Sequence, residues 1–195
     1  MTVQPGQFHS NHAKPLHDRR FTAHLELVNQ SSEHKFYYFA YGSCMCPVDL
    51  KRSLGENTHQ YVIGPATLSD YRLAFYGYSD LRNCGVLDVI KQPNASVEGV
   101  LYQLPMRLSD ALDRREVGYR YEIVELVSQG KRYQNVRTYS VIDKLSEELA
   151  PNDWYLNTVL RGAVTCGLPE QYCWRLFNHM YQLQQHCSAA KMRSA

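Results

Sequence analysis

The sequence contains a series of short strand-like segments separated by only a few residues. The first is the aromatic run Phe36–Tyr41, which ends at Gly42 and is typical of a buried strand. Further strands are expected at 61–68, 71–78, 84–90, 97–104, 120–127 and 132–142. Because a parallel crossover needs many more residues than these links contain, antiparallel neighbours are favoured.

Helices are expected between and after these strands. Four helices are predicted: two begin at Pro47 and Pro169, and the other two are expected to be capped by Ser109 and Asp153. The helix that begins at Pro169 has the clearest pattern, since Tyr172, Leu176 and Met180 recur at helical spacing. Strands followed by helices predict an α+β fold, in which helices flank a small, barrel-like, mainly antiparallel mixed sheet.

The two ends of the chain are expected to lie outside this domain. We predict a polar, histidine-rich N-terminal arm at 1–33, a folded domain at 34–187 and a fraying tail at 188–195. The histidine spacings in the arm match no standard metal site, so a polar arm is favoured over a metal-binding one.

Charge and hydropathy exclude several classes of protein. Lys and Arg total 21 and Asp and Glu total 19, so the net charge of +2 gives no signal for nucleic acid or anionic membrane. No apolar run approaches the ~20 residues that span a bilayer, and the polar first twenty residues lack a secretory signal core. We expect a cytoplasmic protein with free thiols and without nucleic-acid or membrane partners; the oligomeric state is left open.

The first candidate site is the junction from Tyr41 to Met45, between the aromatic strand and the helix that begins at Pro47. Such a junction directs unpaired backbone N–H groups to one point, where the positive end of the helix favours a carboxylate or an oxyanion. A tight connection without a function explains the same pattern equally well.

Two cysteines in this junction suggest other roles. Cys44 and Cys46 could be metal ligands, but no second Cys or His pair lies at a spacing that completes a site. Cys44 could also be an activated nucleophile or a thiol sensor near a helix N-terminus, but no histidine base is placed to serve it.

The second candidate is Glu116, at the end of a predicted helix and before Gly118. A carboxylate in partly aromatic surroundings can have a raised pKa and exchange protons near neutral pH. Local pattern alone favours a surface salt bridge to a neighbouring arginine, since charged residues are mostly exposed.

Five short motifs in this order then suggest a family. They are Tyr41-Gly-Ser, Gly85-Val86, Glu98-Gly99-Val100, Leu112-Asp-x-x-Glu116 and Gly167-Leu168-Pro169-x-x-Tyr172. Over roughly residues 36–183 the chain therefore resembles the gamma-glutamylcyclotransferases. The resemblance implies a small barrel flanked by helices. It also implies release of 5-oxoproline from a gamma-glutamyl amine or amino acid by internal cyclisation, without a metal or organic cofactor.

The resemblance also implies roles for individual residues. Glu116 matches the family's catalytic glutamate, a general acid and base. The substrate-binding residues implied are Tyr41, Gly42, Ser43, Cys44, Met45, Tyr121 and Tyr155, and Tyr119 is the open alternative to Tyr121. Cys44 is a departure, because the family usually has Asn there, and the identity of the leaving amine stays open. The alternative is a non-catalytic binding module that retains the pocket for a small carboxylate ligand or a partner peptide.

Overall fold

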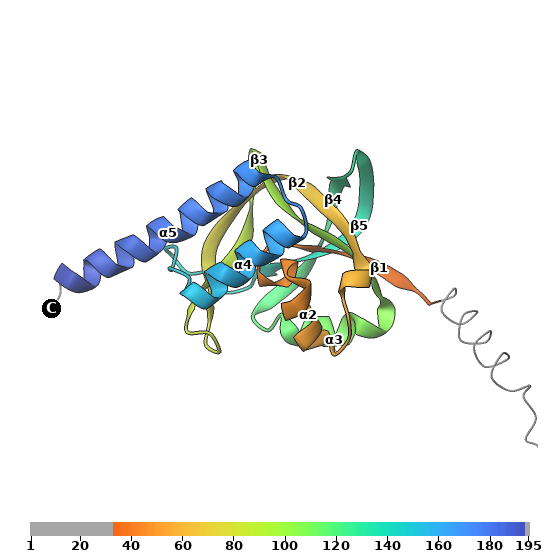
Figure 1. Ribbon diagram of the computed structural model, residues 1–195, viewed down its shortest axis with the longest axis horizontal. Coiled ribbons are helices and arrows are strands. Elements are labelled where there is room, and N and C mark those ends of the chain that lie inside the picture. The colour runs from red at the N-terminus through yellow and green to blue at the C-terminus, as the bar shows by residue number, and fades with distance from the viewer. Residues whose placement is uncertain (1–32, 194–195) are drawn as a thin grey trace, which may run out of the picture. The chain divides into compact units, whose positions relative to one another are not determined.

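The computed structural model describes residues 33–193, with side chains as far as 186, so nearly all of the predicted arm lies outside it. Five strands form a closed barrel in the order β1-β3-β2-β4-β5 (Figure 1). Their bounds are β1 Lys35–Ala40, β2 Val62–Ser79, β3 Cys84–Pro105, β4 Tyr119–Ser128 and β5 Lys131–Val141. All neighbours are antiparallel except the parallel pair β1 and β5. The predicted mixed, mainly antiparallel barrel is confirmed.

Two strands are much longer than predicted, because β2 and β3 each join two segments that the sequence indicated as separate. The gap at Ser69 and Asp70 between two predicted strands is instead an irregularity within one strand, where the β2–β3 register shifts between Ser69 and Tyr71. Asp70 has a positive φ of 62°, and its carboxylate accepts the N–H of Asn94 at 2.9 Å. A bulge of this kind bends a strand without ending it, so turn-type residues were misleading here.

The four predicted helices are confirmed, with three short 3-10 turns added. Their bounds are α2 Pro47–Leu54, α3 Ser109–Arg115, α4 Asp153–Thr165 and α5 Glu170–Arg193, and the turns are η1 Ser43–Met45, η2 His59–Tyr61 and η3 Met106–Leu108. In Figure 1, α4 and α5 cross the front of the barrel, while α2 and α3 lie near its lower end. Helix α5 continues into the segment predicted as a tail.

Two of the predicted helix caps are wrong. Asn152, not Asp153, caps α4, since its side chain accepts the N–H of Tyr155 at 2.8 Å. Ser109 lies inside the first turn of α3, and its hydroxyl accepts a hydrogen bond from Arg137 at 2.8 Å instead. In both cases the helix exists as predicted, and only the capping side chain differs.

The core holds the junction after β1 rigidly in place. Phe39, Met45 and Leu50 are fully buried, so the strand, the turn and α2 share one hydrophobic core. Gly162 brings α4 directly against the turn, because a Cβ there would lie 2.5 Å from the backbone nitrogen of Cys46. The helix therefore packs on the backbone of the junction and fixes its position.

Candidate active site

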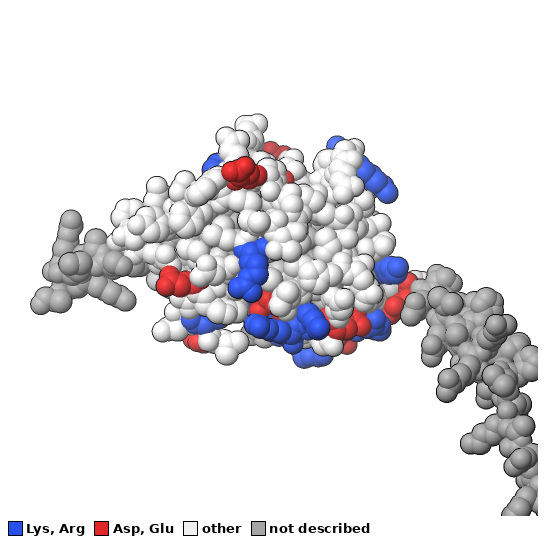
Figure 2. Space-filling view, in the orientation of Figure 1, with Lys and Arg blue, Asp and Glu red and all other residues white. Residues whose placement is uncertain are grey.

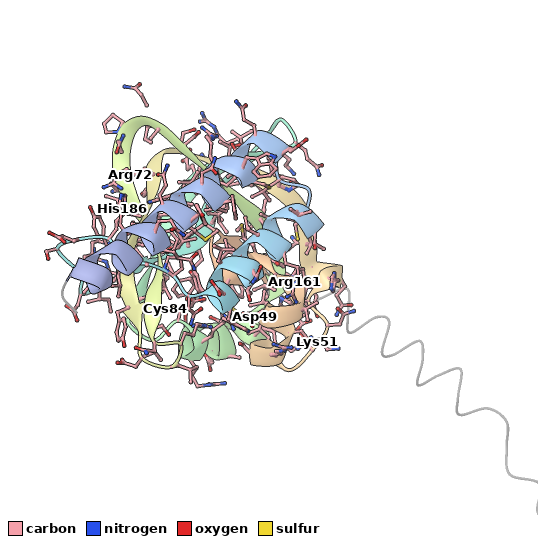
Figure 3. The ribbon with its side chains drawn as sticks, turned by 60° about the vertical axis from the view of Figure 1, so that its left-hand side comes forward. Asp49, Lys51, Arg72, Cys84, Arg161 and His186 are labelled. Atoms are coloured by element: carbon pink, nitrogen blue, oxygen red, sulfur yellow. The ribbon has the colours of Figure 1, made fainter. Side chains whose placement is uncertain are left out.

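Several parts of the chain line a cavity of about 900 Å³. They include the turn η1, the connection between β2 and β3, the end of α3 and the start of α4. Asp49 of α2 lines the cavity, and Cys84 begins β3 just after the connection that lines it. Both side chains lie in the lower part of the molecule in Figure 3.

Most of the predicted site residues line this cavity, namely Tyr41, Gly42, Ser43, Cys44, Glu116 and Tyr155. Met45 does not, because its side chain is fully buried in the core. Tyr121 does not line it either: it is 53% exposed, and its ring packs on the guanidinium of Arg137 at 4.7 Å.

Tyr119 takes the place that was expected for Tyr121. It lies two residues earlier on β4, lines the cavity and donates from its hydroxyl to the carbonyl of Leu87 at 2.9 Å. Two residues along a strand keep a side chain on the same face but move it by about 7 Å. Of the two tyrosines left open by the sequence, Tyr119 lines the cavity and Tyr121 does not.

The turn η1 presents backbone donors to the cavity. Its carbonyls accept later N–H groups, with Met45 N to Gly42 O at 3.0 Å and Cys46 N to Ser43 O at 3.1 Å. No side chain caps the turn, and within the described residues the N–H groups of Ser43 and Cys44 have no hydrogen-bond acceptor. Pro47 then begins α2, where its missing N–H is not needed.

Gly42 is required by a close approach of α4. A Cβ at Gly42 would lie 3.0 Å from the hydroxyl of Tyr155 and 3.8 Å from the side chain of Leu87. A larger residue would force the tyrosine away from the turn. The turn and Tyr155 therefore form one wall of the cavity.

Glu116 faces this wall from the end of α3. Its backbone N–H donates to the carbonyls of Leu112 and Asp113, both at 3.2 Å, so the residue is held in the last turn of the helix. Its Oε1 accepts the thiol hydrogen of Cys44 at 2.9 Å. The side chain is only 13% exposed, so the surface salt bridge favoured by local pattern is not what forms.

Arg115 connects Glu116 to the turn and to α2. Its Nε donates to the Cys44 sulfur at 2.9 Å and lies 3.8 Å from Glu116 Oε1, and its other nitrogens reach Asp49 at 2.5 Å and Ser43 Oγ at 3.3 Å. The arginine and aspartate side chains are each 9% exposed. The sequence indicates Arg115 only as a surface partner of Glu116, because a position beside Glu116 in the chain does not reveal that the arginine is buried.

Burial sets the protonation of the two facing groups. It raises the pKa of Glu116, although the charge of Arg115 and the hydrogen bond from Cys44 oppose this shift. It also raises the pKa of the Cys44 thiol to about 12, against the opposing charge of Arg115. The thiol therefore stays protonated and donates to Glu116, and no histidine lines the cavity among the described residues. This geometry disfavours Cys44 as a nucleophile.

The cavity tyrosines differ in whether their hydroxyl hydrogen is available. Tyr41 donates to the carbonyl of Tyr139 at 2.5 Å, and Tyr119 donates to Leu87 O. Tyr155 instead accepts the N–H of Leu87 at 3.0 Å, which leaves its own hydrogen for a bound molecule. Burial raises the pKa of Tyr155, so this hydrogen is retained at neutral pH.

Charged side chains of both signs lie close together along the lower edge in Figure 2, while much of the remaining face carries few charges. Among the described residues, no group of three or more His, Cys, Asp and Glu side chains could hold a metal ion. No helix in the described part of the chain is long and apolar enough to cross a membrane.

Comparisons of sequence place these features among known proteins. Residues 96–176 match the AIG2-like family. The chain is 31% identical over 156 residues to YkqA of Bacillus subtilis, a protein named as a candidate gamma-glutamylcyclotransferase, in a match that covers 78% of this chain and 54% of YkqA. It is 25% identical over 144 residues to the gamma-glutamylcyclotransferase of Mus musculus, covering 70% of this chain and 74% of the mouse enzyme.

Comparisons of structure agree. The crystal structure of YkqA superposes with a TM-score of 0.70 at 28% identity, over 80% of this chain and 58% of that one. An uncharacterized protein from Homo sapiens superposes with a TM-score of 0.65 at 26% identity, over 74% of this chain and 87% of that one. The chain thus spans little more than half the length of YkqA.

Proposed function

This chain belongs to the AIG2-like, or gamma-glutamylcyclotransferase, family, and on that premise we propose that it releases 5-oxoproline from a small gamma-glutamyl compound. Glu116 is the general acid and base of this reaction. The substrate is a gamma-glutamyl amine or amino acid, bound in the cavity between the turn η1 and α4.

The observation that carries the proposal is the setting of Glu116. Its carboxylate is mostly buried, has a raised pKa and accepts a hydrogen bond from Cys44 at the cavity wall. A carboxylate with a raised pKa is a stronger base than an exposed one, and it exchanges protons more readily near neutral pH. Perturbed carboxylates in a cavity with convergent polar groups are typical of catalytic sites.

The proposed reaction begins with proton transfer. Glu116 accepts a proton from the α-ammonium group of the substrate, which frees the nitrogen lone pair to attack the γ-carbonyl carbon. The resulting tetrahedral intermediate collapses as the bond between this carbon and the leaving nitrogen breaks, and Glu116 returns the proton to that nitrogen. The ring nitrogen still carries a second proton, which passes through Glu116 to the departed amine. The products are therefore neutral-ring 5-oxoproline and a protonated amine, and atoms and charge balance without a further reactant.

The cavity supports this cyclisation in two further ways. Ring closure joins two ends of one molecule, so a cavity that holds the substrate folded removes much of the entropic barrier. The N–H groups of Ser43 and Cys44 and the hydroxyl hydrogen of Tyr155 are donors without protein acceptors among the described residues. Such donors stabilise the α-carboxylate of the substrate or the oxyanion that develops on the γ-carbonyl.

A panel of substrates tests the proposal. The protein is incubated with gamma-glutamyl dipeptides, gamma-glutamyl-lysine and glutathione, and 5-oxoproline is measured by mass spectrometry. We expect 5-oxoproline from at least one of them. Saturable binding of a glutamyl ligand without turnover of any substrate would instead indicate the non-catalytic binding module.

Two variants of Cys44 separate a donor from a nucleophile. Cys44→Ser keeps a hydroxyl donor for Glu116, so we expect it to retain activity. Cys44→Ala removes the donor, so we expect a decrease of a few-fold, in keeping with about 1 kcal/mol for one hydrogen bond. Equal and complete loss in both variants would indicate a thiol nucleophile and contradict the proposed role of Glu116.

A further inference from the structure

Every nitrogen of the Arg115 guanidinium forms a hydrogen bond. Its Nε donates to the Cys44 sulfur at 2.9 Å, and one terminal nitrogen donates to Ser53 Oγ. The other terminal nitrogen donates to Asp49 at 2.5 Å and to Ser43 Oγ at 3.3 Å. The side chain is only 9% exposed, so water competes little for these contacts. One arginine therefore joins the turn η1, helix α2 and the end of α3.

The contact between Arg115 and Cys44 fixes the direction of the thiol hydrogen. A guanidinium donates hydrogen bonds but has no acceptor. The sulfur of Cys44 therefore accepts from Arg115, and its own hydrogen is given to Glu116 Oε1 at 2.9 Å. The Nε of Arg115 stays 3.8 Å from the same oxygen. Arg115 thus orients the group that donates to Glu116.

Asp49 anchors this arginine and offsets its charge. It lies on α2, is labelled in Figure 3 and has a side chain that is only 9% exposed. Burial raises the pKa of Glu116, the charge of Arg115 lowers it, and the charge of Asp49 raises it. A buried arginine without Asp49 would make Glu116 a weaker base. The pair can therefore hold the turn at a smaller cost to the basicity of Glu116.

Other titratable groups around Glu116 come from each element packed against it. They are Tyr38 in β1, Tyr41 after β1, Cys44 in η1, Asp49 in α2, Arg82 between β2 and β3, Arg115 in α3, Tyr119 in β4 and Tyr155 in α4. Burial raises the pKa values of the four tyrosines and the thiol, so they stay uncharged at neutral pH. Of the charged groups, Arg115 has the largest influence on Glu116.

We propose that Arg115 is a positioning residue of the cyclisation: anchored by Asp49, it holds the donors of the turn η1 and the carboxylate of Glu116 at a fixed separation. This inference rests on the proposed function. In that reaction the substrate's α-amine contacts Glu116 while the donors of the turn meet a substrate oxygen, so both sides must be in place at once. Arg115 is attached to both, because it precedes Glu116 in the chain and donates to two side chains of the turn.

A double variant of the full chain separates positioning from stability. Arg115→Met combined with Asp49→Leu replaces the buried pair by apolar side chains, which is often neutral or stabilising, whereas removal of one partner leaves a buried charge. We expect the double variant to stay folded by circular dichroism. Its kcat for 5-oxoproline release should nevertheless fall by about 10²-fold, the effect of a small misplacement of reacting groups. An unchanged kcat in the folded double variant would overturn the inference.

The pH dependence of kcat/KM is a readout that a merely structural role would not move. The double variant loses both charges, of which Arg115 has the larger influence on Glu116, so the midpoint of the rise with pH should move higher. Asp49→Asn removes only the negative charge, so the midpoint should move lower. The same midpoint in both variants and in the unaltered protein would contradict the inference.

Arg115→Lys is the conservative variant and carries the test if the double variant does not fold. It keeps the charge but loses the planar fork, so kcat should fall by about tenfold while the midpoint stays near that of the unaltered protein. Arg137→Lys is the matched control, because Arg137 also donates to a serine hydroxyl and pairs with a carboxylate of α3. It should change neither value. Full kcat in Arg115→Lys, or the same loss in Arg137→Lys, would overturn the inference.

The same experiment separates this inference from the proposed function. If the unaltered protein and the Arg115 variants form 5-oxoproline equally well, the inference is wrong and the proposed function stands. If the unaltered protein forms none from any substrate of the panel, the proposed function fails, and the inference fails with it.

Discussion

Two arginine clusters in this molecule use the same side chains but differ in their surroundings. At the cavity, Arg115 pairs with Asp49 and donates to a serine hydroxyl. On β5, Arg137 pairs with Asp113 at 3.3 Å and also donates to a serine hydroxyl. The first pair is 9% exposed on both sides, while the second is 16% and 45% exposed.

The neighbours of the two clusters differ accordingly. Arg115 lies beside Glu116, whose pKa is raised by burial. Arg137 lies between the rings of Phe36 and Tyr121, with its guanidinium 4.6 and 4.7 Å from their centroids, and holds α3 to the barrel. Burial, rather than residue type, therefore distinguishes the cluster for which we propose proton transfer from the one on β5.

The two clusters should differ most in how the loss of a carboxylate affects kcat. Glu116→Gln should lower kcat by about 10² to 10⁴, because a general acid and base contributes a factor of this size. Asp113→Asn, on the same helix but in the Arg137 cluster, should keep kcat within about twofold. The rate of 5-oxoproline release is measured for both variants. Full activity in Glu116→Gln would show that the Arg115 cluster is no more important for the reaction than the Arg137 cluster.

The arginines should differ in their contribution to stability. Arg115→Gln leaves Asp49 buried without its partner, so we expect the free energy of unfolding to fall by about 3–5 kcal/mol. Arg137→Gln breaks a more exposed pair and should reduce it by about 1 kcal/mol. Urea unfolding followed by circular dichroism measures both, and equal losses would show that burial does not separate these pairs.

A smaller difference in kcat/KM is expected between a tyrosine at the cavity and a tyrosine beside Arg137. Tyr155→Phe removes the hydroxyl that can donate to substrate and should lower kcat/KM by about tenfold, the range of one buried hydrogen bond. Tyr121→Phe keeps the ring that packs on Arg137 and should leave kcat/KM unchanged. If Tyr121→Phe were the more damaging change, the placement of the substrate at the cavity would be wrong.

The sequence predicts local features of this molecule better than it predicts the contacts between distant segments. The aromatic strand before Gly42 and the helices that begin at Pro47 and Ser109 follow from periodicity and from helix-start signals. The length of β2 does not, because Asp70 can occupy a positive φ in a turn or in a bulge, and only the partner strand decides between them.

The same limit applies to the site. Glu116 and the turn stand in short motifs that resemble the family, which is why they could be singled out although local pattern alone favoured a surface salt bridge for Glu116. Arg115 becomes part of the site only because α3 packs against the turn, and Tyr119 replaces Tyr121 because the cavity ends between them. Gly162 supports the turn from a distant helix, and a glycine inside a helical pattern gives no sign of which segment it contacts.

The pH dependence of kcat/KM tests whether Glu116 is the general base, because it reports the pKa values of the free enzyme's essential groups. Glu116 must be ionised to accept a proton, and burial raises its pKa above the ordinary value of 4.5. We therefore predict that kcat/KM rises with pH through a midpoint above 4.5. Cys44→Ala should move this midpoint higher, because the thiol's hydrogen bond lowers the pKa of Glu116. A midpoint at or below 4.5 would contradict the proposed role of Glu116. The same rise of kcat/KM with pH in Glu116→Gln would also contradict it.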